Sequence, residues 1–334
     1  MTAALLDPPT DDATRRQLLA GGAAVALGLV GCGSDPPARR SGARVEHRHG
    51  TTQVPPDPQR VVALGFTDHD YLLALGVVPV AVSTRGNGSE ERFGVGPWAL
   101  PKLGETAPKV LPYAEIDTEA VAALRPDLIT GFTSGMTAQE YRALSKVAPT
   151  VAQPKGAPDY YAPWDVVTRL AGRALGQVGP AGELIADVET RFARARRAQP
   201  AFDRATAVYA GVLGPREYYV EAPSSSRVEI LTALGFEIPA AIAKLAGKET
   251  YAEISRERLD LLDGDVLVWE LGSGVRRADI EADPLYKLLP VARDDRAVFV
   301  EDADLTAAMA SISVLSLPLV VDRLVPMLAA VAPA

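Results

Sequence analysis

The sequence has one cysteine and three histidines, and its net charge is not positive but -8. Cys32 is the only cysteine of the 334 residues, so the chain can form neither an internal disulfide nor a cluster of thiolate metal ligands. Lys and Arg number 34 against 42 Asp and Glu, and the interspersed charges lack the basic face that nucleic-acid binding needs. With 48% hydrophobic residues, the chain has material for a sizeable core and fits two domains.

Residues 1–31 have the layout of an export signal. Arg15 and Arg16 precede an uncharged run from Leu18 to Val30, whose 13 residues fall short of the ~20 needed to span a bilayer. The paired arginines resemble a twin-arginine signal, although export by the Sec route stays open. Residues 29–32 (Leu-Val-Gly-Cys) resemble the lipobox of bacterial lipoproteins.

The lipobox resemblance implies cleavage before Cys32 and acylation of its thiol. The mature protein would then be anchored to the outer face of the cell membrane by its lipid. The alternative is an ordinary signal peptide that leaves a buried free cysteine. Residues 32–43, rich in Pro, Arg, Gly and Ser, are expected to form a flexible tether.

After residue 44, short β-branched runs alternate with helical segments. We expect strands at 61–64, 77–82, 127–130, 150–153, 207–212, 265–269 and 297–300, and helices at 70–75, 118–124, 138–147, 227–234 and 257–262. This rhythm is typical of βαβ units with mostly parallel sheets. A weak internal repeat indicates two similar lobes: Glu119-x4-Leu124-x2-Asp127 has the same spacing as Glu257-x4-Leu262-x2-Asp265.

One long helix is predicted at residues 180–198, between the two halves. Pro180 suits the first turn, four late arginines complement the helix dipole, and Leu184, Ile185, Val188 and Phe192 form an apolar stripe. Nineteen residues make a rod about 29 Å long. We therefore expect an α/β fold of two Rossmann-like lobes with mainly parallel sheets, residues 44–179 and 200–334, joined by a helix at 180–199 that permits modest rocking.

Several short motifs occur in a distinctive order. They are Pro58-x-Arg60-Val61-Val62-Ala63, Leu73-Ala74-Leu75-Gly76-Val77-x-Pro79, Glu119-x-Val121-Ala122-Ala123-Leu124-x-Pro126-Asp127, Gly172-x-x-Leu175-Gly176, Ile230-Leu231-x-x-Leu234-Gly235 and Ser316-Leu317-Pro318. Together, from about residue 45 to 330, they resemble the periplasmic-binding proteins of the iron-siderophore and vitamin B12 class. The N-terminal half is similar in more detail to actinobacterial members, some of which are associated with haem.

The resemblance implies a class III periplasmic-binding-protein fold with a shallow cleft between its lobes. It further implies a monomeric carrier without a cofactor, which captures a ferric siderophore and delivers it to an ABC permease dimer. Haem or cobalamin binding on the same scaffold is one alternative. A ligand sensor or interaction protein is another, because fold alone does not dictate function.

Loops after the strands hold the candidate ligand contacts, because ligands of open α/β sheets bind outside the carboxyl ends of the strands. Arginine donors and aromatic faces suit a bulky, often anionic ferric siderophore. We expect contacts at Phe66, Asp68, Arg85, Trp98, Thr133, Arg216, Tyr219, Trp269 and Arg276. Solvated arginines and core-packed aromatics are the alternative for each, and core packing is favoured for Trp164.

Glu119 and Glu257 occupy matching positions in the internal repeat. In the family that the chain resembles, a glutamate on each lobe docks into arginine pockets on the two permease subunits, and such pairs fix orientation more than affinity. The alternative is an acidic first turn of a helix, stabilised by the helix dipole.

Catalytic and metal-binding motifs are not evident. Ser134 stands one place late for a nucleophile elbow, no glycine-rich phosphate loop follows the first strand, and no His-Glu metal motif occurs. His47 and His49 alternate on an expected first strand, where a solvated face is favoured over a metal pair. The sequence therefore favours a carrier over an enzyme and predicts no bound metal.

Overall fold

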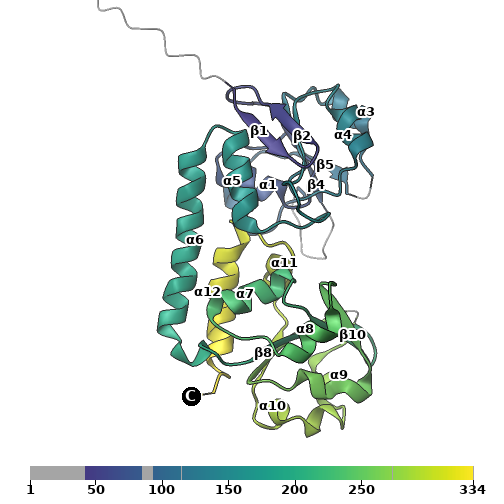
Figure 1. Ribbon diagram of the computed structural model, residues 1–334, viewed down its shortest axis with the longest axis vertical. Coiled ribbons are helices and arrows are strands. Elements are labelled where there is room, and N and C mark those ends of the chain that lie inside the picture. The colour runs from purple at the N-terminus through teal and green to yellow at the C-terminus, as the bar shows by residue number, and fades with distance from the viewer. Residues whose placement is uncertain (1–41, 85–92, 114, 273, 334) are drawn as a thin grey trace, which may run out of the picture. The chain divides into compact units, whose positions relative to one another are not determined.

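The computed structural model of the chain describes residues 42–84, 93–113, 115–272 and 274–333 (Figure 1). Over these residues the strands form two five-stranded sheets and one two-stranded hairpin. The predicted fold class, α/β with two lobes, is confirmed. In the described part of the chain, no helix combines the length and apolarity that crossing a membrane requires.

The first lobe contains a fully parallel sheet in the order β5-β4-β3-β6-β7. Its strands are β3 (Val61–Ala63), β4 (Ala81–Thr84), β5 (Lys109–Pro112), β6 (Leu128–Thr130) and β7 (Thr150–Val151), beside the hairpin of β1 (Arg44–His47) and β2 (Gly50–Gln53). Its helices are α1 (Asp68–Ala74), α2 (Leu100–Leu103), α3 (Thr118–Ala123), α4 (Ala138–Leu144) and α5 (Trp164–Ala174). The central strands β3 and β6 are buried throughout, as parallel strands covered on both faces must be.

The second lobe contains a mixed sheet in the order β10-β9-β8-β11-β12. The strands β8 (Ala207–Gly214), β11 (Val266–Glu270) and β12 (Ala297–Val300) are parallel, whereas β9 (Glu217–Glu221) and β10 (Tyr251–Ile254) run antiparallel. The segment 216–219, expected as a loop, instead turns into β9 as a hairpin. Around the sheet lie α7 (Ser226–Leu234), α8 (Ala240–Ala246), α9 (Arg277–Glu281), α10 (Pro290–Arg293), α11 (Ala303–Ala310) and the 3₁₀ helices η1 (Pro200–Phe202), η2 (Arg256–Leu262) and η3 (Tyr286–Leu288).

Two aspartates of the internal repeat play the same part in the two lobes. Asp127, just before β6, accepts the backbone N–H groups of Gln59 and Arg60, each at 2.8 Å, ahead of β3. Asp265, just before β11, accepts the backbone N–H of Thr206 at 2.7 Å, ahead of β8. Each carboxylate thus fixes the start of the neighbouring parallel strand. The preceding helices differ, since α3 is an α-helix and η2 is a 3₁₀ helix.

The long helix α6 (Val178–Ala198) begins two residues before the predicted position and ends where predicted. Its buried stripe includes Ile185, Val188 and Phe192, and it packs against α5, α7 and α12 (Ser316–Ala329). Figure 1 shows α12 running beside α6. One hydrophobic cluster runs from β3 and α5 through α6 and α12 to α7 and β8.

The segment that leads into α12 also contacts the first lobe. The Tyr71 hydroxyl donates to the carbonyl of Ile312 at 3.3 Å, and the Ser313 hydroxyl donates to the Asp70 carboxylate. The chain therefore meets the first lobe again after the second sheet is complete.

Candidate functional site

At the carboxyl ends of β3 and β6, a buried carboxylate organises two adjoining loops. Asp68, the fully buried first residue of α1, accepts the backbone N–H of Phe132 and both the N–H and hydroxyl of Thr133, each at 2.9 Å. Burial raises the pKa of Asp68, and these hydrogen bonds oppose the rise. Gly65 is required here, because a Cβ at this position would lie 2.0 Å from the Asp68 carboxylate. Asp68 thus lies behind the loop surface that Thr133 helps to form.

Three aromatic rings form a wall on the same edge of the first lobe. Phe66 meets Tyr113 edge-on with ring centroids 6.1 Å apart, and Tyr113 lies 5.4 Å from Tyr160. Tyr160 is 43% exposed and has a positive φ of 62°, a conformation that is uncommon outside glycine. Its ring rests on Gly135, where a Cβ would lie 2.4 Å from Cζ. A strained, exposed aromatic residue on a built seat points to a binding surface.

The second lobe presents a tyrosine seated in the same way. Tyr219 on β9 lies across Gly211 of β8, where a Cβ would come within 2.2 Å of its hydroxyl oxygen. Its ring meets Tyr251 edge-on at 5.7 Å. Each lobe therefore uses a glycine to let a tyrosine ring approach the backbone.

A charged network lies beneath Tyr219. Arg227 binds both oxygens of Glu270, at 2.6 and 3.1 Å, and approaches Glu221 at 3.3 Å. The Tyr209 hydroxyl donates to Glu270 at 2.5 Å. Burial raises the pKa of Glu221, and the Arg227 guanidinium opposes that rise. The network joins α7 to three strands of the second sheet.

Residues of both lobes line a small hollow. From the first lobe it is lined by Phe66, Thr67, Thr133, Tyr160, Tyr161, Ala162 and Trp164, and from the second by Ser226, Glu229, Ala310 and Ile312. The Tyr161 hydroxyl donates to Glu229 at 3.0 Å, directly across the hollow. Burial raises the pKa of Glu229, and the bond from Tyr161 opposes the rise. Hydroxyl groups and aromatic faces therefore dominate the described lining.

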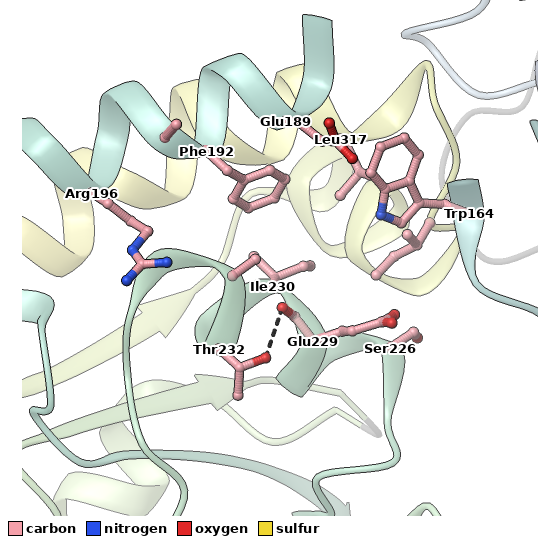
Figure 2. Close-up of a pocket in the computed structure, with 12 residues that line it drawn as sticks. Trp164, Glu189, Phe192, Arg196, Ser226, Glu229, Ile230, Thr232 and Leu317 are labelled. Atoms are coloured by element: carbon pink, nitrogen blue, oxygen red, sulfur yellow. Dashed lines mark hydrogen bonds between the residues drawn. The ribbon is translucent and has the colours of Figure 1, made fainter. Parts of the chain in front are cut away.

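A larger cavity of about 480 Å³ adjoins this hollow between α6 and α7 (Figure 2). Figure 2 shows Phe192 and Ile230 facing its middle, with Arg196 towards one end and Trp164 towards the other. Trp164, Ser226, Glu229 and Ile312 line both spaces. Trp164, expected as a core residue, packs partly against the core and also lines the site.

The structure corrects the expectation for Trp269, whereas a ligand contact at Trp98 stays a prediction. Trp269 is fully buried in the core of the second lobe, where its ring stacks on Phe299, so it offers no surface to a ligand. Trp98 is half-buried and donates its indole N–H to Asp70 at 2.7 Å, which ties the segment before α2 to α1. The strand-end position of Trp269 suggested a loop contact, but the alternation of β11 turns its side chain inward.

Two of the three predicted arginines, Arg216 and Arg276, do not line the hollow. Arg216 is exposed at the turn between β8 and β9, beside a separate depression of about 430 Å³ that Arg256 and Asp283 also line. Arg276 is exposed and binds Asp279 at 2.8 Å, at the start of α9. Arg85 and Cys32 lie outside the described residues.

Both predicted docking glutamates are exposed at the first turn of their helices. Glu119 follows the N-cap Asp117 of α3, and Glu257 follows Arg256 at the start of η2. Their matching positions are thus kept in the structure. Docking to a permease stays a prediction.

The two strand histidines lie in a packed environment. His47 is 1% exposed and its Nε2 lies 2.9 Å from the Thr52 hydroxyl, so the expected solvated face is wrong. His49, in the turn after β1, contacts the carbonyl of Met136 at 2.9 Å. Burial lowers the pKa of His47 to about 4, with His49 a smaller cause. Among the described residues, no group of three or more His, Cys, Asp or Glu is placed to hold a metal ion.

The residues of the hollow that sequence reasoning missed include Tyr160, Tyr161, Ser226 and Glu229. The paired tyrosines at 160 and 161 follow β7, so the rule that ligands bind at the carboxyl ends of strands could have found them. Ser226 and Glu229 lie on the first turn of α7, and the contact with Tyr161 depends on the packing of the lobes.

Comparison with known proteins agrees with this architecture. The family model described as periplasmic binding protein matches residues 61–303, well over half of the chain. The chain is 27% identical over 267 residues to the Fe(3+) dicitrate-binding periplasmic protein FecB of Escherichia coli, covering 78% of this chain and 82% of that protein. It is 29% identical over 244 residues to YfiY of Bacillus subtilis, named a probable siderophore-binding lipoprotein, covering 67% of each.

Two solved structures share this fold. A periplasmic solute binding protein from Mycobacterium smegmatis has 36% identity and a TM-score of 0.78, over 88% of this chain and 99% of that one. PiaA of Streptococcus pneumoniae, solved in complex with ferrichrome, shares the fold at a TM-score of 0.72 and 24% identity, over 87% of this chain and 98% of that one. With two α/β lobes meeting at a lined hollow, the chain belongs to the periplasmic binding protein family, in its siderophore and vitamin B12 type, and is a solute-binding protein rather than an enzyme.

Proposed function

We propose that this chain captures a ferric siderophore between its two lobes and delivers it to an ABC importer. The observation that carries the proposal is the hollow that both lobes line, with aromatic rings and hydroxyl groups converging from separate loops. Aromatic faces suit the organic shell of an iron chelate, and hydroxyls donate hydrogen bonds to its coordinating oxygens. Two similar proteins, one named for binding ferric dicitrate and one solved in complex with ferrichrome, support the same ligand class.

Retention at the membrane belongs to the proposal. Cleavage after residue 31 and acylation of Cys32 would leave residues 32–43 as a tether to the lobes. The lipoprotein name of the Bacillus relative supports this anchor. The lobe boundaries at residues 44–179 and 200–334, with the connecting helix at 180–199, are proposed as units that rock about α6.

Delivery to an importer rests on Glu119 and Glu257. Both carboxylates are exposed at equivalent sites of the two lobes. We infer that each meets a basic pocket on one subunit of a permease dimer, which sets the orientation of docking.

Tryptophan fluorescence tests ligand capture. Trp164 lines the hollow, whereas Trp98 and Trp269 are held in packing contacts, so a ligand in the hollow should quench mainly Trp164. We expect ferrichrome or ferric dicitrate to quench the emission with a Kd of about 1 μM or tighter, near −8 kcal/mol. The variant Trp164→Phe should lose most of the quenching.

The same titration separates the alternatives. Quenching by haemin or cyanocobalamin, with no response to either ferric siderophore, would replace the ligand class and keep the carrier. No response to any of these compounds would favour a sensor or interaction protein.

A further inference from the structure

The cavity between α6 and α7 is far larger than the hollow it adjoins. Its volume is about 480 Å³, against about 30 Å³ for the hollow. Figure 2 shows that Phe192 and Ile230 face the space between Arg196 and Trp164. Trp164, Phe192, Ile230 and Leu317 give the cavity a mostly apolar lining, which suits a hydrophobic group of a ligand.

The lining of the cavity suits an uncharged chain. Ala193 on α6 and Ala233 on α7 line it, and their small side chains leave its middle open. Of the three charged residues that line it, Arg196 lies 3.8 Å from Asp203 and Glu229 accepts the bond from Tyr161, whereas Glu189 is exposed to solvent. An incoming alkyl or aryl chain would bury apolar surface without separating either charge from its partner.

We propose that this cavity binds an apolar arm, an alkyl or aryl chain, carried by a ferric siderophore whose iron complex lies between the lobes, against the residues of the hollow. The proposal rests on the function proposed above and adds a class of ligand, an amphiphilic siderophore. Trp164, Ser226, Glu229 and Ile312 line both spaces, so the arm would leave the iron complex beside these residues.

Iron-free n-alcohols test the cavity independently of any siderophore. Each buried methylene should strengthen binding about fourfold, so affinity should rise by up to about 200-fold from 1-butanol to 1-octanol, followed by Trp164 fluorescence. An increase of less than about fivefold over this series would overturn the proposal.

A variant whose cavity is filled by larger side chains tests whether the alcohols bind there. The double substitution Ala193→Leu/Ala233→Leu adds bulk from both walls and should abolish the dependence on chain length. The control is Ala186→Leu, which adds one leucine on the exposed face of α6, outside the cavity, and should leave the dependence intact. An unchanged chain-length dependence in the filled variant would place the alcohols elsewhere and overturn the proposal.

Ferrioxamine B acylated on its terminal amine tests the arm itself. The N-decanoyl complex should bind at least tenfold more tightly than the N-acetyl complex, and only when the cavity is open. Equal affinity of the two complexes would overturn the arm while leaving siderophore capture standing. Binding of alcohols but of no ferric complex would overturn the transport proposal and the arm with it, and would leave an alkyl-binding cavity.

Discussion

The network around Arg227 gives a prediction whose size follows from the structure. The substitution Arg227→Met keeps much of the side-chain volume and removes the charge that faces Glu270 and Glu221. The three side chains are 21%, 14% and 7% exposed, so all are substantially withdrawn from water. Removing one member of a buried ion pair costs about 3–5 kcal/mol. The hydrogen bond that Tyr209 still donates to Glu270 favours the lower end, about 3 kcal/mol.

Urea unfolding followed by circular dichroism measures this loss. Arg258→Met is the control, because Arg258 and Asp260 are 54% and 67% exposed and such a pair contributes less than about 1 kcal/mol. Without Arg227, the pKa of Glu221 would rise further above its unfolded value. The penalty should therefore be largest at pH 8 and shrink towards pH 5, as the carboxyl group takes up a proton. A loss equal to that of the control, or one independent of pH, would refute the reasoning.

Three further predictions concern stability, binding and docking. The pKa of His47 is lowered to about 4, so keeping this histidine neutral contributes up to about 3 kcal/mol of stability above pH 6.5. This contribution should be lost as pH falls towards 4. In acid unfolding curves, the variant His47→Gln should lack this loss of stability. Gly135→Ala should displace the Tyr160 ring and weaken ferric siderophore binding by about 0.5–1.5 kcal/mol, as measured by calorimetry. An unchanged affinity would count against a role of the aromatic wall in binding. Glu119→Lys and Glu257→Lys should each reduce iron uptake by cells without changing ligand affinity, whereas Glu183→Lys on the exposed face of α6 should leave uptake unchanged.

The elements that the sequence predicted best are those whose own residues set their burial. The runs at 207–212 and 265–269 are mostly apolar, with two valines each, and they became β8 and β11 at the centre of the second sheet. The helix at 180–198 has arginines in its last turn and an apolar stripe of its own, so only its predicted start was off, by two residues.

Elements that depend on distant partners were missed. The strand β5 is mostly exposed and ends in a proline, and only its pairing with β4 makes it a strand. The segment 216–219 contains charged residues typical of a loop, yet the neighbouring β8 recruits it into a hairpin.

The site was predictable in its location more than in its residues. Loops after the first and third predicted strands do line the hollow, through Phe66 and Thr133. Tyr160 and Glu229 belong to it only because the lobes pack as they do, and no local pattern encodes that meeting. The charge and hydrogen-bond donors of arginine favoured Arg216 and Arg276 as ligand contacts, but the fold places both away from the hollow.

Anomalous diffraction at the iron edge tests the central claim most directly, using crystals of the protein grown with ferrichrome. One iron peak should lie between the wall of Phe66 and Tyr160 and the first turn of α7 at Ser226. An iron peak in the depression beside Arg216, or a protein without iron under saturating ferrichrome and ferric dicitrate alike, would contradict the account.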